Sequence, residues 1–151
     1  MIELPPDIPP PSTAPTEIVE KCVRFNSEYF NVPELAIKAI LDVEGGKMCT
    51  VSKNSNGSYD LGLMQINTIN LPYIQEQYPE ITAEDIACKP CLNITAGTWL
   101  LSQRIREEND VWKGIGHYHS RTPKYRDRYL KRISRSIKKL VNADKAKNDG
   151  V

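Results

Sequence analysis

The sequence is poor in aromatic residues, in histidine and in long apolar runs. Aromatic residues make up 7% of its 151 residues, and its two histidines are His117 and His119. Only one close cysteine pair, Cys88 and Cys91, is available, whereas structural zinc sites usually take two close ligand pairs. No apolar run approaches the roughly 20 residues of a membrane span. The sequence therefore predicts no metal or other cofactor and no membrane insertion.

The N-terminus, Met1-Ile2-Glu3-Leu4-Pro5, lacks the basic start and the apolar stretch of a secretory signal. Either the protein is cytosolic or an export signal has been removed. The four cysteines fit structural disulfides better than free thiols, metal ligands or a redox pair, because the close pair falls in an expected loop around Pro90. Disulfides persist in oxidising compartments. We therefore expect an exported protein.

Four cysteines allow three disulfide connectivities, and the sequence alone leaves the choice open. A Cys88–Cys91 bridge would close only a very small ring, which disfavours the connectivity that contains it. We favour Cys22–Cys91 together with Cys49–Cys88. In the chain-entropy model, bridges across loops of this length each contribute about 4 kcal/mol to stability.

Charge is unevenly distributed along the chain. Residues 121–151 contain eleven Lys and Arg and three Asp and Glu, whereas residues 1–120 contain nine and sixteen, although the net charge is only +1. The aromatic residues of the basic segment, Tyr125 and Tyr129, fall in an apolar stripe, so we expect them in the core rather than stacked on bases. We expect no nucleic-acid partner. A basic helix on an acidic body can instead meet anionic wall polymer, phospholipid or a protein partner.

The chain length suits one domain with flanking segments. Six prolines among residues 1–15 predict an extended or disordered leader, which we interpret as a spacer, with a docking peptide as the alternative. Helical patterns fill the predicted domain, residues 16–141, and residues 142–151 are expected to form a flexible tail.

Apolar spacing predicts a mostly α fold in which only one segment is irregular or forms a β-hairpin. That segment is 47–60, where Asn56-Gly57 fits a hairpin turn. The expected helices cover residues 16–30, 33–44, 61–71, 93–109, 111–119 and 123–141, with shorter helical turns at 74–78 and 82–86.

Two acids stand out as candidate catalytic residues. Glu44 continues the apolar stripe of a helix and lies in its last turn, so desolvation and the helix dipole both raise its pKa. Asp60 lies in a polar loop, where solvation or hydrogen bonding favours the ionised form. Carboxyl groups in two such environments are what cleavage of a glycosidic bond requires. Taken singly, Glu44 could instead face water, and Asp60 could be a turn or capping residue.

A Gly62-Leu63-Met64-Gln65 run follows the second acid. It offers a backbone that a ligand can approach closely and an amide that both donates and accepts hydrogen bonds. The candidate sugar-binding residues are Met64, Gln65, Asn67, Tyr118 and His119. Core packing is the alternative for Leu63 or Met64.

Residues 17–140 resemble the lysozyme-like lytic transglycosylases, in particular the small members that accompany type III and type IV secretion, conjugation and pilus machines. Four blocks in matching order carry the resemblance. They are Glu44-Gly45, the run from Gly57 to Asn67, the run from Lys89 to Gly97, and the run from Gly116 to Pro123.

The resemblance implies a single lysozyme-like domain that cleaves peptidoglycan in the periplasm, as part of such a machine. In this family, Glu44 would protonate the oxygen of the β-1,4 bond between N-acetylmuramic acid and N-acetylglucosamine. The same residue would then deprotonate the C6 hydroxyl of the muramic ring, which closes a 1,6-anhydro product. Gln65 and Tyr118 match family residues near the acid.

The chain departs from the family pattern at three places. Gly45 stands where the family commonly has Ser, and His117-Tyr118-His119 stands where it commonly has Ala-Tyr-Asn. Many members also lack a second acid, whereas Asp60 is present here. Two alternatives therefore stay open: lysozyme-like hydrolysis of the same bond, and a catalytically weak peptidoglycan-binding module for assembly.

Overall fold

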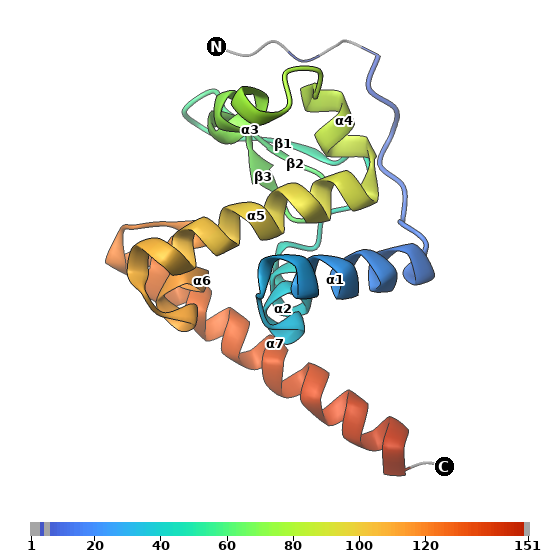
Figure 1. The fold of residues 1–151 in the computed structure, drawn as a ribbon, viewed down its shortest axis with the longest axis vertical. Coiled ribbons are helices and arrows are strands. Elements are labelled where there is room, and N and C mark those ends of the chain that lie inside the picture. Colours follow the sequence, from blue (N-terminus) through green and yellow to red (C-terminus); the bar gives the residue numbers. More distant parts are fainter. Residues whose placement is uncertain (1–3, 5–6, 150–151) are drawn as a thin grey trace.

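Helices dominate the part of the chain that the computed structural model describes, which is residue 4 and residues 7–149 (Figure 1). The mostly α fold class is confirmed. The elements are α1 (Thr16–Phe30), α2 (Glu34–Glu44), β1 (Val51–Lys53), β2 (Tyr59–Leu61), β3 (Ile66–Asn67), η1 (Thr68–Asn70), α3 (Leu71–Gln77), α4 (Ala83–Cys88), α5 (Pro90–Glu108), α6 (Val111–His119) and α7 (Pro123–Asp149).

Helix α5 crosses the middle of the molecule and separates two groups of elements (Figure 1). The sheet, α3 and α4 lie on one side of α5, whereas α1, α2 and α7 lie on the other, and α6 packs against the C-terminal part of α5. Core side chains of α5 such as Ile94 and Leu101 are fully buried. Burial of this apolar surface holds the two groups together and leaves a cleft between them.

The sheet corrects one prediction from the sequence, because residues 61–71 do not form a helix. Strands β1, β2 and β3 pair in that order, all antiparallel, and Asp60 lies opposite Asn67. The chain reverses after β2 because Gly62 and Gln65 have left-handed backbone conformations, with φ values of 68° and 51°. Glycine adopts this conformation without steric cost, which explains Gly62 at the first of the two positions. Of the two alternatives for residues 47–60, an irregular segment or a β-hairpin, the structure has the hairpin, between β1 and β2 around Asn56-Gly57.

At the N-terminus the helical domain begins at Thr16 as expected, whereas at the C-terminus the structure differs from the expected boundary. Within the Pro-rich leader, the backbone of Ser12 exchanges two hydrogen bonds with that of Met48, at 3.0 and 2.9 Å, so this part is extended and fixed to the body. Residues 1–3 and 5–6 of the leader lie outside the described residues. Helix α7 continues past Val141 to Asp149, through part of the predicted flexible tail; residues 150–151 of that tail are likewise not described.

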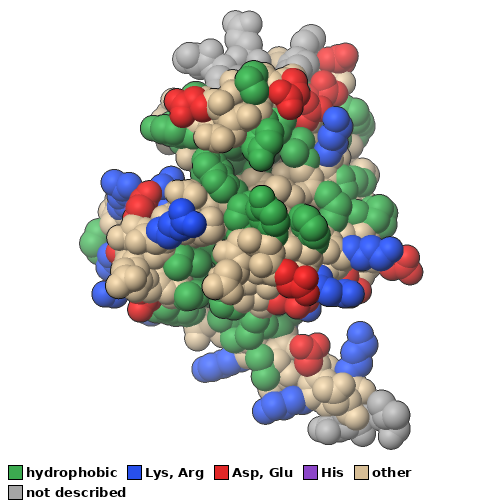
Figure 2. Space-filling view, in the orientation of Figure 1, with side chains coloured by type: hydrophobic (Ala, Val, Ile, Leu, Met, Phe, Trp, Pro, Cys, Tyr) green, Lys and Arg blue, Asp and Glu red, His purple; other side chains and the backbone are tan. Residues whose placement is uncertain are grey.

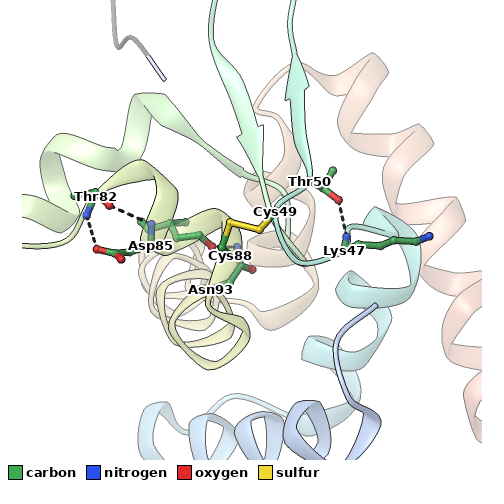
Figure 3. The surroundings of a disulfide bond; sticks show 8 residues. Lys47, Cys49, Thr50, Thr82, Asp85, Cys88 and Asn93 are labelled. Atoms are coloured by element: carbon green, nitrogen blue, oxygen red, sulfur yellow. Dashed lines mark hydrogen bonds between the residues drawn. A yellow bond between two sulfur atoms is a disulfide. The ribbon is translucent and has the colours of Figure 1, made fainter. Parts of the chain in front are cut away.

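Two disulfides, Cys22–Cys91 and Cys49–Cys88, confirm the favoured connectivity. The first joins α1 to the first turn of α5, since Pro90 opens that helix rather than lying in a loop. The second joins the segment before β1 to the end of α4, beside Asn93 (Figure 3). No helix in the described ranges is long and apolar enough to cross a bilayer.

Candidate active site

Glu44 is the last residue of α2, which ends there because Gly45 adopts a left-handed conformation with φ of 64°. The hydroxyl of Tyr129, on α7, donates a hydrogen bond to Oε2 of Glu44 at 3.2 Å. Burial raises the pKa of the Glu44 carboxyl to about 7; the nearby charge of Asp60 adds to this rise, while the Tyr129 hydrogen bond and Arg132 oppose it. The side chain can therefore exist in both protonation states near neutral pH.

Asp60 does not lie in a loop, as the sequence predicted, but in the middle of β2, where its pairing with Ser52 and Asn67 in the sheet fixes its orientation. Its cross-strand partner Asn67 donates a hydrogen bond from Nδ2 to Oδ1 of Asp60 at 2.9 Å, and a second one to Oγ of Ser58 at 3.0 Å. Asp60 and Glu44 both line one cleft of about 570 Å³. The two acids thus occupy opposite walls, one on the helical side and one on the sheet.

The cleft brings together six of the seven residues that the sequence singled out as catalytic or sugar-binding. They are Glu44, Asp60, Gln65, Asn67, Tyr118 and His119. Neutral hydrogen-bonding side chains of the β1–β2 hairpin, Asn54, Asn56 and Ser58, also line it. Amides and hydroxyl groups of this kind suit a sugar chain, which is itself rich in donors and acceptors.

Met64 is the predicted site residue that does not line the cleft. Its side chain is fully buried and packs against Gly97, where a Cβ atom would collide with the Met64 sulfur. The carbonyl of Met64 nevertheless accepts a hydrogen bond from the Tyr118 hydroxyl at 2.8 Å, and Gln65 Nε2 donates to the carbonyl of Gly62 at 2.8 Å. Burial holds the pKa of Tyr118 well above its ordinary value, so this donor stays protonated.

His119 is connected to Glu44 indirectly, through Tyr129. The two rings stack at a centroid distance of 4.4 Å and an angle of 4°, and this places the His119 ring against the tyrosine that binds Glu44. Burial, together with the charge of Arg132, lowers the pKa of His119, while Asp60 opposes this. His119 is therefore mainly neutral at neutral pH, and the charged side chains that line the cleft are the two acids together with Arg104 and Arg121.

Sequence reasoning missed two residues that organise the site. Tyr129 was assigned to core packing because it falls in the apolar stripe of α7, and nothing in its local pattern points to Glu44. Asn93 is fully buried on α5 and satisfies three backbone groups: it donates to the carbonyls of Leu61 and Ile86 and accepts from the N–H of Met64, at 2.8–2.9 Å. A polar residue on an apolar helix face was the available signal for Asn93.

No cluster of three or more His, Cys, Asp or Glu side chains suited to a metal ion occurs within the described part of the chain. The cleft itself offers carboxyl groups and hydrogen-bonding side chains, with the Tyr129 hydroxyl bonded to Glu44.

One wall of the cleft carries an acid at the end of a helix, and the other is a small antiparallel sheet with polar side chains. In a mostly helical fold, this arrangement defines a lysozyme-like site. The "Transglycosylase SLT domain" family model matches residues 21–141, and the chain belongs to this family. Membership supports a lytic-transglycosylase-like function directed at peptidoglycan.

Curated relatives agree with this assignment. The chain is 31% identical over 118 residues to "Invasion protein IagB" of Salmonella typhimurium, which covers 75% of this chain and 72% of the relative. It is 31% identical over 127 residues to "Protein IpgF" of Shigella flexneri, covering 80% and 82%. It is also 29% identical over 136 residues to "Peptidoglycan-binding-like protein" of Escherichia coli O157:H7, covering 83% and 81%.

Proposed function

We propose that this protein is a peptidoglycan lytic transglycosylase that cleaves the β-1,4 bond between N-acetylmuramic acid and N-acetylglucosamine. The observation that carries the proposal is the state of Glu44: a partly buried carboxyl group with a pKa of about 7, on the wall of a 570 Å³ polar cleft. A general acid works best when its pKa lies near the working pH.

The reaction needs one group that first gives and then takes a proton. Protonated Glu44 donates its proton to the glycosidic oxygen, and the bond from that oxygen to C1 of the muramic ring breaks. The Glu44 carboxylate then accepts the proton of the C6 hydroxyl, whose oxygen forms the new bond to C1. The product is a 1,6-anhydro sugar, no water is consumed, and Glu44 ends protonated. The negative charge of Asp60 stabilises the positive charge that develops at C1 between these steps.

Hydrolysis of the same bond is the second candidate, and the presence of Asp60 favours it. A second carboxylate on the opposite wall is the arrangement that lysozyme-type retaining and inverting enzymes use. If water reaches C1 before the C6 hydroxyl does, the product carries a reducing end. A binding module that keeps the fold without catalysis is the third candidate.

Digestion of purified sacculi separates the three candidates. Soluble products are analysed by mass after incubation with the unmodified protein, with Glu44→Gln and with Asp60→Asn. We expect anhydro-muropeptides from the unmodified protein and a loss of at least about a hundredfold in rate for Glu44→Gln, as for removal of a general acid. Reducing-end products that disappear in Asp60→Asn would establish hydrolysis. An absence of products from the folded, unmodified protein would favour the binding module.

We further propose that the protein acts in the periplasm, where it opens the wall locally for a secretion, conjugation or pilus machine. Two disulfides support an oxidising compartment. One relative is named "Invasion protein IagB", which is consistent with a role in a specialised machine. Complementation of a deletion strain by the unmodified gene, but not by Glu44→Gln, would test whether wall cleavage is what the machine requires.

A further inference from the structure

Seven of the ten basic residues of α7 fall into two groups with different surroundings. Arg132 and Lys139 are committed to α2: Arg132 Nη2 donates to the carbonyl of Val43 at 3.0 Å, and Lys139 Nζ lies 2.9 and 2.8 Å from the two carboxylate oxygens of Asp42. These contacts hold α7 against the helix that ends in the catalytic acid. These contacts account for Arg132 and Lys139, but not for the other basic residues of α7.

Five further cations form an outer stripe along α7. The outer stripe consists of Lys124, Arg128, Lys131, Arg135 and Lys138. All five side chains are exposed, and within residues 7–149 none of them pairs with a carboxylate. Their spacing of four, three, four and three residues places them within an arc of about 80° at about 100° per residue, over a length of about 21 Å. Between residues 124 and 138 the acid of α7 is Asp127, which already pairs with Arg126.

The outer stripe faces away from the cleft. Tyr129 and Ile133 lie on the opposite side of the helix, where they are 2% and 0% exposed, and the Tyr129 hydroxyl contacts Glu44. Helix α7 also forms the edge of the molecule and extends beyond α2 (Figure 1), and Lys and Arg side chains project along it in the space-filling view (Figure 2). A surface that meets the outer stripe would therefore leave the cleft accessible.

The chemistry of the outer stripe fits a flat anionic surface. One exposed aromatic ring lies beside it: Tyr125, which we expected in the core, is 49% exposed, and Lys124 Nζ lies 5.8 Å from its ring centroid. The other four cations have no exposed large aromatic neighbour on the described part of α7 that could stack on bases. Arg135 also borders a hollow of about 330 Å³ between α7 and α2, where Arg132 and Lys139 are already engaged by Val43 and Asp42, so Arg135 is the cation of this hollow left to meet an outside anion. Clusters of four to eight Lys and Arg on one helix face are typical of binding to anionic phospholipids.

We propose that the outer stripe of α7 binds anionic phospholipid headgroups at a membrane surface. The helix then lies parallel to the membrane, the acidic remainder of the chain points away from it, and the cleft is presented to the side opposite the lipid. The attraction is electrostatic and without insertion, so it weakens as salt screens it. The inference does not depend on whether the cleft cleaves or only binds glycan.

Vesicle binding by the full-length protein tests the proposal. The vesicles contain phosphatidylcholine alone, or phosphatidylcholine with about one third phosphatidylglycerol, near the anionic content that gives membranes their surface potential. A stripe variant carries K124Q, R128Q, K131Q, R135Q and K138Q. A matched control carries K21Q, R24Q, K53Q, R106Q and K113Q, which are exposed residues outside α7 and remove the same charge. Glutamine keeps nearly the helix propensity of Lys and Arg, and circular dichroism checks the fold of both variants.

We expect the unmodified protein and the control to bind anionic vesicles with affinities within about threefold of each other, and the stripe variant to bind at least about tenfold more weakly. Neutral vesicles should bind none of the three, and high salt should release the bound protein. An equal loss in both variants would overturn the proposal, because net charge alone would then account for binding. Stripe-dependent binding to duplex DNA or to sacculi, without binding to anionic vesicles, would also overturn it and identify a different partner.

Discussion

At the scale of single residues, the function proposed here depends on a carboxyl group that the fold makes difficult to ionise. The ordinary pKa of glutamate, 4.5, rises to about 7 at Glu44, mainly because the side chain is buried. The folded state therefore binds the Glu44 proton more tightly than the unfolded state does. The contribution of Glu44 to stability is complete below about pH 4.5 and is lost as the pH rises through about 7.

Replacement of this residue should therefore stabilise the protein, but only at high pH. Glu44→Gln cannot ionise, and its amide oxygen can still accept the hydrogen bond of Tyr129. We expect little difference in the free energy of unfolding at about pH 4, and a gain of up to about 3 kcal/mol at about pH 8.5, from 1.36 kcal/mol per pKa unit. Denaturant titrations at both pH values measure this. A variant less stable than the unmodified protein at both would contradict it.

Tyr129 sets how far the pKa of Glu44 rises, because its hydrogen bond favours the carboxylate. Tyr129→Phe removes this bond, so the pH at which activity on sacculi falls should move upward. A net hydrogen bond of about 1 kcal/mol corresponds to a shift of roughly 0.7 pH unit. Tyr125→Phe, at an exposed position of the same helix, is the matched control. An unchanged pH profile in Tyr129→Phe would show that the hydroxyl does not act on Glu44.

At the scale of elements, one buried amide joins α5 to the sheet and to α4. Asn93→Leu would leave the carbonyls of Leu61 and Ile86 and the N–H of Met64 without their partner. Each buried group left unsatisfied costs about 1–3 kcal/mol, so we expect a loss of at least about 3 kcal/mol in the free energy of unfolding. Asn142→Ala, at an exposed position of α7, should change it by less than about 0.5 kcal/mol. Chemical denaturation measures both, and similar values for the two variants would contradict this role.

Elements with a long apolar stripe could be predicted from the sequence to within a few residues, as α1, α2, α5 and α6 were. The sheet could not, because strands of two or three residues are too short for alternation to be recognised and depend on their cross-strand partners. The turn after β2 was wrongly assigned to a helix, because its conformation also depends on a contact with a residue far away in the sequence. Its left-handed conformations at Gly62 and Gln65 are supported by Asn93, which is remote in the sequence.

At the scale of the whole molecule, the site is completed by contacts between distant parts of the chain. Tyr129 and Glu44 are 85 residues apart, and the ion pair of Lys139 with Asp42 spans 97 residues. The two acids could be predicted because local sequence places one at a helix end and one in a polar segment. Their supports could not, because the docking of α7 on α2 follows from the packing of the whole chain.

The two disulfides act on different parts of this arrangement, so their removal should have separable effects. Cys22–Cys91 spans 69 residues and Cys49–Cys88 spans 39, and each should contribute about 4 kcal/mol in the chain-entropy model. Cys49–Cys88 fastens the segment before β1 to α4, on the side of α5 that carries Asp60. Cys22–Cys91 fastens α1 to α5, away from the acids.

We therefore expect the double variants Cys22→Ala/Cys91→Ala and Cys49→Ala/Cys88→Ala to lose similar stability, but only the second to lose activity on sacculi under conditions in which both remain folded. Denaturant titration measures the first effect, and the initial rate of product release measures the second. Equal rates in the two folded variants would mean that the hydrogen bonds of Asn93 and of Asp60 with Asn67 hold the sheet wall of the cleft without help from Cys49–Cys88. A rate lost only in the first variant would mean that the geometry of the cleft depends on how α1 packs against α5.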